Sequence, residues 1–314
     1  MDANVRENRR IAFLGASVTK GEMVARGKEY VAVLEEKWKK TFPSCRQPEF
    51  INAGTSGTLS GNAMFSVGTL IEKEPDMVFL DYSVNDTGDA WLVEAFESLV
   101  YRLLQQGCFV VILLFCNQSG HCTRGAMTKI ARHYGIPLLD IGKTVMEHIR
   151  DGKFLWEDFA SDYVHPSEFG HAFIADEILK FFQRENLTEC SQVPVCPKSF
   201  CFGGIFCDLK VVPAQEYEKQ KFRFEDNFST IVVEYTQVPT PSECRMDIFV
   251  DGKWIKTIER YSDFSWNNRV VTFLLAEDKN SRHVVELRPA SGAVFSDDEW
   301  SAFHVVFGLG HLCQ

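Results

Sequence analysis

Short apolar runs alternate with segments of helical periodicity over residues 10–185, and this alternation constrains the fold more than any other feature. A continuous apolar run bounded by glycine, as at residues 10–15, is typical of a parallel strand buried on both faces. Such strands alternating with helices predict an α/β fold with a parallel sheet between two helical layers. We expect strands at residues 10–15, 49–52, 77–80, 109–114 and 137–140, and helices at about 27–40, in a segment ending at Leu70, and at about 89–105, 123–134 and 167–183.

The pattern changes after about Glu185. A linker-like stretch from Cys190 to Cys207 precedes segments with apolar residues at alternate positions, and the pair Asp251-Gly252 favours a tight hairpin. Short strands separated by turns predict a β-sandwich of about 110 residues. We therefore expect an α/β domain at residues 1–188, a linker at 189–207 and a β-sandwich at 208–314. Strands of the second domain are expected at residues 230–235, 246–250, 270–275 and 283–287.

Charge and composition narrow the range of partners. The chain has 314 residues and a formal net charge of −10, which disfavours nucleic acid and anionic membranes because both attract clustered Lys and Arg. No apolar stretch approaches the ~20 residues that cross a bilayer, and we expect no signal peptide. A cytoplasmic location, with the ten cysteines as thiols, is therefore expected. A neutral small molecule or an oligosaccharide is the expected partner, and a homo-oligomer is left open.

Polar residues follow three of the predicted strands. Ser17 follows the first strand, Gly57 lies in a loop of small residues after the second, and Asn85 follows the third. Ligands of parallel α/β sheets bind outside the carboxyl ends of the strands. We therefore expect these three loops to form one site.

The segment Asp162-Tyr163-Val164-His165-Pro166 supplies the groups that would activate a serine. A serine hydroxyl needs a base to accept its proton, and a carboxylate fixes the tautomer of a histidine base and stabilises its cation. We expect Ser17 as the nucleophile, His165 as the base and Asp162 as the carboxylate. The backbone N–H groups of Ser17 and Gly57 and the side-chain amide of Asn85 are the candidate oxyanion donors.

Four sequence blocks make residues 10 to about 185 resemble the SGNH/GDSL hydrolase superfamily, and they occur in the family's order. The blocks are Gly15-Ala16-Ser17-Val18, Asn52-Ala53-Gly54-Thr55-Ser56-Gly57, Ser83-Val84-Asn85-Asp86 and Asp162-Tyr163-Val164-His165-Pro166. The resemblance implies a flavodoxin-like three-layer α/β/α domain and ester hydrolysis without a metal or other cofactor. Ala16 replaces the family's usual acidic residue and Ser83 its usual glycine, but neither position attacks or transfers a proton. Block alignment favours Gly57 over Gly54 as the oxyanion glycine.

An SGNH domain followed by a β-sandwich is similar to carbohydrate O-acetylesterases that carry a carbohydrate-binding-type module. This resemblance implies a serine esterase that removes O-acetyl groups from oligosaccharides through an acyl-enzyme. One alternative is an acyltransferase or thioesterase that uses the same site. Another is a carbohydrate-binding protein with a vestigial hydrolase site.

Several further residues have both functional and structural interpretations. Aromatic side chains suit sugar binding, so Trp91, Trp156 and Trp266 are candidate substrate contacts; Trp254, Trp266 and Trp300 would form either a sugar platform or part of the core. His171 is expected to be structural, and Asp86 to be a turn residue. The spacing of Cys190, Cys196, Cys201 and Cys207 favours thiols over a zinc site.

Overall fold

The computed structural model describes two compact units, Met1–Phe202 and Gly203–Gln314. The described residues are 9–185, 194–204, 206, 207, 209–214, 221–238, 244–261, 269–290 and 304–311, and side chains are described for all of them except 269–279. None of the helices in these ranges is long and apolar enough to span a bilayer.

The first unit is built on a parallel sheet with the strand order β2-β1-β3-β4-β5. The strands are β1 (Arg10–Gly15), β2 (Glu49–Gly54), β3 (Met77–Asp81), β4 (Phe109–Leu114) and β5 (Leu138–Asp140). β3 and β4 are buried along their whole length, as expected for central strands covered on both faces. The predicted α/β fold and the positions of all five strands are confirmed.

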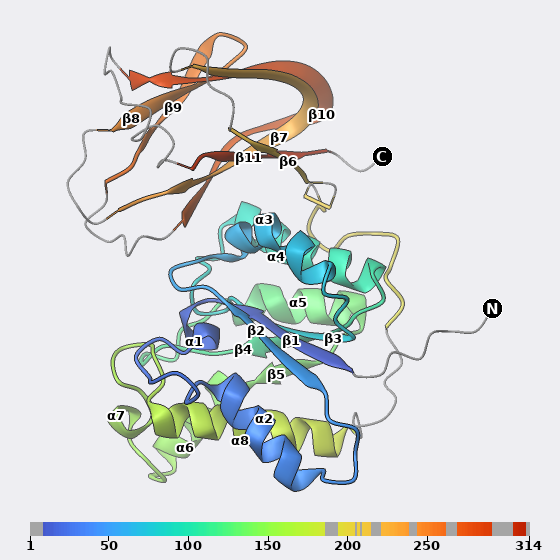
Figure 1. Cartoon of the computed structure of the whole chain (residues 1–314), viewed down its shortest axis with the longest axis vertical. Helices are drawn as coiled ribbons and strands as arrows, with labels where there is room; N and C mark the ends of the chain where they lie inside the picture. Colours follow the sequence, from blue (N-terminus) through green and yellow to red (C-terminus); the bar gives the residue numbers. More distant parts are fainter. Residues whose placement is uncertain are drawn as a thin grey trace. The chain divides into compact units, whose positions relative to one another are not determined.

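Helices cover both faces of this sheet (Figure 1). α3 (Ser60–Ile71), α4 (Ala90–Gln105) and α5 (Arg124–Tyr134) lie on one face, and α2 (Tyr30–Thr41), α6 (Ile141–Arg150) and α8 (Glu168–Arg184) lie on the other. Aromatic rings join the second layer to the sheet: Phe13 stacks on Phe79 with ring centroids 4.8 Å apart, and Phe79 lies 5.7 Å from Phe182. This core fixes the carboxyl ends of the strands, where the polar loops begin.

Three helices were not anticipated. Two are single turns, α1 (Ser17–Lys20) and α7 (Trp156–Phe159), and α6 is longer. A sequence signal for α6 exists, because Ile141 and Val145 are one helical turn apart and buried, and the Asp140 side chain caps the helix by accepting from the Lys143 N–H. The short β5 obscured this signal, since the helix begins at the residue after the strand ends.

The second unit is an antiparallel sheet of six strands in the order β6-β11-β7-β10-β8-β9. The strands are β6 (Lys210–Pro213), β7 (Phe222–Thr236), β8 (Arg245–Val250), β9 (Lys253–Glu259), β10 (Arg269–Pro289) and β11 (Val306–Gly310). The predicted Asp251-Gly252 hairpin joins β8 to β9, and both residues have positive φ. Two strands predicted separately, at 270–275 and 283–287, are parts of the single long strand β10.

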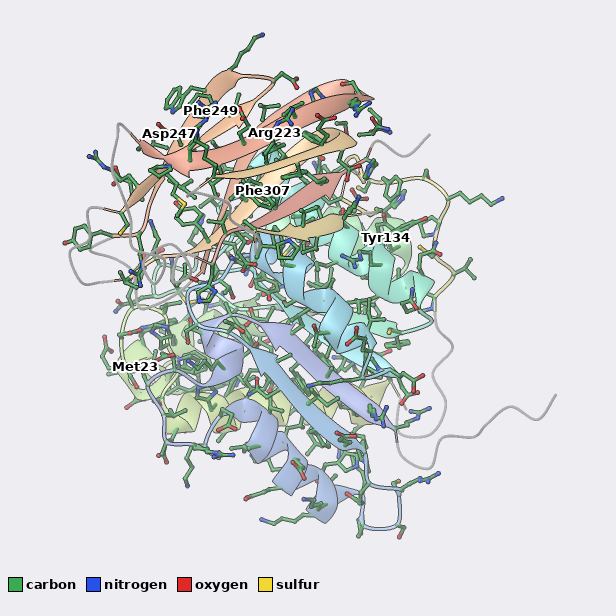
Figure 2. The ribbon with its side chains drawn as sticks, turned by 45° about the horizontal axis from the view of Figure 1, so that its top comes forward. Met23, Tyr134, Arg223, Asp247, Phe249 and Phe307 are labelled. Atoms are coloured by element: carbon green, nitrogen blue, oxygen red, sulfur yellow. The ribbon has the colours of Figure 1, made fainter. Side chains whose placement is uncertain are left out.

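This sheet folds back on itself around one core. Phe307 is the register partner of Val233 near one end of β7, yet its ring stacks 6.0 Å from that of Phe222 at the other end. The two halves of β7 therefore lie on opposite sides of a shared apolar interior, which also holds Ile248 and Leu287. Figure 2 shows Phe307 among the strands of this unit. The domain has the two-layered core of a sandwich, but its described strands form one continuous hydrogen-bonded sheet.

Residues before the boundary at Phe202 belong to the first unit. Glu97 is buried on α4, where its carboxylate accepts hydrogen bonds from the Cys201 and Phe202 N–H groups and from the Tyr134 hydroxyl. The Tyr101 and Phe200 rings lie 4.7 Å apart. This part of the expected linker is therefore attached to the helical layer of the α/β unit.

Candidate active site

Ser17, His165 and Asp162 form one continuous row of hydrogen bonds, although 148 positions separate the serine from the histidine. His165 Nε2 lies 3.0 Å from Ser17 Oγ, and His165 Nδ1 lies 2.7 Å from Asp162 Oδ2. A carboxylate oxygen only accepts, so Nδ1 carries the proton and Nε2 is the acceptor that faces the serine hydroxyl. This is the arrangement in which an imidazole can take a proton from a serine.

The loop that carries this histidine is shaped around Asp162. Its Oδ1 accepts from the Val164 and His165 N–H groups at 2.8 and 2.7 Å, while its backbone carbonyl accepts from Trp156 Nε1 at 2.8 Å. Partial burial alone would raise the pKa of Asp162, but the hydrogen bonds from His165 and Val164 outweigh it and lower that pKa. Asp162 is therefore ionised at neutral pH and orients the imidazole.

Ser17 is the first residue of α1, directly beyond the carboxyl end of β1. N–H groups in the first turn of a helix have no intrahelical acceptor, and the described residues provide no hydrogen-bond partner for that of Ser17. Ser17 is only 7% exposed, and its hydroxyl faces His165. The sequence thus places a hydroxyl and an unpaired N–H at the same position.

The strand order places the other two oxyanion candidates on either side of Ser17. β1 lies between β2 and β3, so the Ser17 loop has the Gly57 loop on one side and the Asn85 loop on the other. Hydrogen bonds attach the start of the Gly57 loop to the end of β1 and to α1: the Thr55 N–H donates to the Gly15 carbonyl at 2.9 Å, and Asn52 Nδ2 donates to the Thr19 carbonyl at 2.8 Å.

The two candidate glycines have different physical roles. The Gly54 N–H already donates to Asn52 Oδ1 at 2.9 Å, and a Cβ there would lie 2.2 Å from the Lys20 backbone nitrogen. Gly54 is therefore required for close packing of β2 against α1. Gly57 is exposed in a turn with φ of +69°, and no hydrogen bond in the described part of the chain uses its N–H. Of these two glycines, Gly57 is the one whose N–H is available to a ligand.

Asn85 lies in the turn after β3 with its side-chain amide uncommitted within the described ranges. Its neighbour Asp86 is more than a turn residue. The Asp86 carboxylate accepts from the Ser60 N–H at the start of α3 at 3.0 Å, and burial raises its pKa to about 7. This bond joins the loop that carries Asn85 to the loop that carries Gly57.

A buried polar network supports α1 from beneath. Asp81 ends β3 and accepts from the Thr19 hydroxyl at 2.9 Å, and the Thr19 and Tyr30 hydroxyls are also 2.9 Å apart. The Tyr30 N–H donates to His171 Nδ1 at 3.1 Å. Burial raises the pKa of Asp81 to about 7 and lowers that of His171 to about 4. His171 is therefore neutral and bonded to backbone, which agrees with a structural role.

The tryptophan candidates fall in different places. Trp156 is buried beneath the Asp162 loop, which favours support of that loop over contact with substrate. Trp91 is partly exposed at the start of α4. Trp254 is 58% exposed on β9, and its Nε1 lies 3.2 Å from Asp247 Oδ1. Trp266 and Trp300 lie outside the described residues.

Both units contain cysteine thiols, but no cysteine belongs to the hydrogen-bonded row of Ser17, His165 and Asp162. Cys196 and Cys201 are partly exposed and Cys207 is buried, whereas Cys190 lies outside the described residues. No group of His, Cys, Asp and Glu among the described side chains is arranged to hold a metal ion.

Comparisons with known proteins agree with this architecture. The family model described as GDSL-like Lipase/Acylhydrolase family matches residues 13–173, and no curated protein sequence matches the chain. A solved two-domain esterase active on acetylated mannans, co-crystallized with mannopentaose, is similar at a TM-score of 0.81 and 23% identity over 98% of this chain and 92% of that chain. Another structure of a two-domain esterase active on acetylated mannans gives 0.78 and 23% over the same shares. The likeness shows that the fold of both units is shared.

Proposed function

The chain belongs to the GDSL-like lipase/acylhydrolase family, and we propose that within it this protein is a serine esterase that removes O-acetyl groups from oligosaccharides. The observation that carries the proposal is the hydrogen-bonded row from Ser17 through His165 to Asp162, next to the uncommitted donors of Gly57 and Asn85. Acyl transfer needs both parts: a nucleophile with its base, and donors for the charge that develops on the carbonyl oxygen.

In the first half-reaction, Ser17 Oγ attacks the acetyl carbonyl carbon while His165 Nε2 takes the hydroxyl proton. The negative charge on the carbonyl oxygen is met by the N–H groups of Ser17 and Gly57 and the amide of Asn85. As the intermediate collapses, the bond from the carbonyl carbon to the sugar oxygen breaks, and His165 returns the proton to that oxygen. The products are the free sugar hydroxyl and acetyl-Ser17.

Water completes the reaction by the same route. His165 takes a proton from a water molecule as the water oxygen bonds to the acetyl carbon. The second tetrahedral intermediate then breaks its bond to Ser17 Oγ, His165 returns the proton to that oxygen, and acetic acid leaves and ionises to acetate. Asp162 remains ionised throughout and stabilises the imidazolium formed in each half-reaction. Its lowered pKa supports this role over the neutral pH range.

The carbohydrate part of the proposal has separate support. The solved esterase that shares both units of this fold is described as active on acetylated mannans and was co-crystallized with mannopentaose. Because the two chains are 23% identical over 98% of this chain, the likeness supports the choice of an oligosaccharide as the substrate class.

The test is acetate release by the full chain from acetylated mannan, xylan and chitin fragments, with products identified by mass spectrometry. We expect loss of acetyl groups by wild type and not by Ser17→Ala. Hydrolysis that survives in Ser17→Ala would contradict the mechanism. Transfer of acetyl to an added sugar acceptor or from acyl-CoA, with no net release of acetate, would instead favour an acyltransferase. Binding of oligosaccharide without turnover would favour a vestigial site.

A further inference from the structure

Glu22 lies on the segment after α1 and contacts the loop that holds Gly57. Its carboxylate accepts a hydrogen bond from the Ser56 hydroxyl, and this bond is the main reason that the pKa of Glu22 is lowered. Lys20 Nζ lies 3.6 Å from the same carboxylate. The Glu22 side chain is 42% exposed, so burial does not explain its placement, and the contact with Ser56 does.

The contact joins the two halves of the site. On one side, the Glu22 N–H donates to the Ser17 carbonyl at 3.0 Å, so this residue is attached to the nucleophile's own turn. On the other side, Ser56 directly precedes Gly57. The His165 imidazole is also close enough to contribute to the lowered pKa of Glu22. Glu22 therefore joins the Ser17 turn to Ser56, and among the described contacts its side chain bonds to neither Ser17 Oγ nor the Gly57 N–H.

Gly57 needs such an attachment. It is exposed and adopts φ of +69°, and the buried Thr58 that follows it bonds to the Thr55 carbonyl at 2.6 Å and to Tyr82, not to the α1 side of the site. The bonds made by Asn52, Gly54 and Thr55 all precede the turn. Among the described contacts, the Ser56–Glu22 bond is the link nearest to Gly57 that reaches the segment directly after α1. Oxyanion stabilisation depends on donors that are held in place before the charge appears.

We infer that Glu22 is a positioning residue that acts through Ser56 to hold the Gly57 N–H toward the oxyanion. The inference rests on the proposed esterase function and adds a residue that the four sequence blocks do not contain. An exposed carboxylate beside Lys20 has one competing role, which is direct contact with a substrate hydroxyl. The two roles differ in kinetics, because a contact made equally in the ground state and the transition state changes KM, whereas an oxyanion donor acts on kcat.

The experiment compares Glu22→Ala, Ser56→Ala and the double variant with wild type in the full chain, using p-nitrophenyl acetate and an acetylated oligosaccharide. We expect kcat to fall about 5- to 30-fold in each single variant with KM unchanged, which is less than the loss of a whole oxyanion donor. The double variant should be no slower than the singles, since both substitutions break the same link. Glu22→Gln keeps an acceptor oxygen and should restore part of kcat.

Glu29→Ala is the matched control. Glu29 lies on the same connection between α1 and α2, but its carboxylate accepts from the Gly27 N–H at 2.6 Å and does not bond to Ser56. The Glu29→Ala substitution should leave kcat unchanged. Because Ser56→Ala removes only a hydroxyl, it keeps the test valid if Glu22→Ala misfolds, and thermal melting of each variant checks this.

Three results would overturn the inference: an unchanged kcat in Ser56→Ala, a rise in KM alone, or fully additive losses in the double variant. Failure of the proposed function looks different. In that case wild type shows no hydrolysis, or Ser17→Ala retains it. Active wild type with inactive Ser17→Ala and an unaffected Ser56→Ala would reject only the role of Glu22.

Discussion

The protein contains two Ser–His–Asp rows of nearly the same geometry, one in each unit. In the α/β unit, Ser17 Oγ lies 3.0 Å from His165 Nε2, and His165 Nδ1 lies 2.7 Å from Asp162. In the β unit, Ser281 Oγ lies 2.7 Å from His283 Nε2, and His283 Nδ1 lies 2.7 Å from Asp251. By hydrogen-bond distances alone, the row at Ser281 would be at least as good a catalytic candidate as the row at Ser17.

Their surroundings differ. Ser17 begins a helix at the carboxyl edge of a parallel sheet, between two loops with uncommitted donors. Ser281 lies inside β10, paired with Phe228, and His283 follows it on the same face of the strand. The His283 side chain is 5% exposed, and its ring lies 4.7 Å from the Phe228 ring.

The second row therefore holds structure together. Asp251 is in the β8–β9 turn, its second oxygen accepts from the Val284 N–H at 2.9 Å, and its own N–H donates to the Val284 carbonyl at 2.9 Å. These bonds attach the β8–β9 turn to β10. Three side chains in a row therefore do not define a hydrolase site, because the chemistry also needs access for an acyl group and donors for its oxygen.

The largest expected effect is the difference in kcat between Ser17→Ala and Ser281→Ala. Ser17→Ala should lower kcat for acetyl ester hydrolysis by about 10⁴- to 10⁶-fold, because it removes the hydroxyl that is proposed to form the acyl-enzyme. Ser281→Ala is the matched control and should leave kcat unchanged. Both are measured with p-nitrophenyl acetate. A large loss in Ser281→Ala, in a variant that melts like wild type, would mean that the second row is also catalytic.

Substitution of the two carboxylates, Asp162 and Asp251, should give the next largest difference in activity between the two rows. Asp162→Asn keeps the size of the side chain but no longer favours a proton on His165 Nδ1, so kcat should fall about 10³- to 10⁴-fold. Asp251→Asn makes the same change in the β unit and should not alter kcat. Steady-state kinetics at pH 7 decides this, and equal rates for wild type and Asp162→Asn would remove Asp162 from the mechanism.

Substitution of Asn85 tests whether an oxyanion donor distinguishes the row at Ser17 from the row at Ser281. Asn85→Ala removes one donor without touching the row and should lower kcat about 10²- to 10³-fold with little change in KM. Its neighbour Asp86 is kept, so the attachment to Ser60 remains. If kcat changed less than twofold, the oxyanion would have to be stabilised by groups other than Asn85.

A smaller effect concerns stability of the β unit. Asp251→Ala leaves the buried His283 Nδ1 without its acceptor and frees the β8–β9 turn, so the free energy of unfolding should fall by about 1–3 kcal/mol. Urea unfolding of the full chain, followed by a probe in the second unit, measures this while esterase activity in dilute urea reports on the first. No loss of stability would argue against a structural role for the second row.

A further expected effect is on the pH dependence of stability. The pKa of Asp81 is about 7 in the folded chain against a usual 3.8, so between these values the folded state holds a proton that the unfolded state has released. Stability therefore falls as pH rises from about 4 to 7 and levels off above 7. Asp81→Asn removes this contribution. Urea midpoints at pH 5 and pH 8 should differ less in the variant than in wild type, and an unchanged difference would show that Asp81 does not cause it.

Much of the first unit could be predicted from local pattern. Apolar runs mark its five strands because a strand buried on both faces leaves no place for polar residues, and the polar loops follow those runs directly. α6 was missed because it starts immediately after a three-residue strand. In the second unit, the break in alternation between residues 275 and 283 suggested two strands, whereas the structure has one long strand with register shifts there.

The residue types at the carboxyl edge of the sheet, including Ser17, Asn85 and the Asp162–His165 pair, could be predicted from local sequence patterns. Which of these groups can meet a substrate depends on packing between distant segments. This packing left the Gly57 N–H uncommitted while occupying that of Gly54, buried Trp156 beneath its loop, joined Glu22 to Ser56, and formed a second row around His283. The physical reason is that availability depends on hydrogen bonds and burial between segments far apart in the chain, and local periodicity contains no information about those partners.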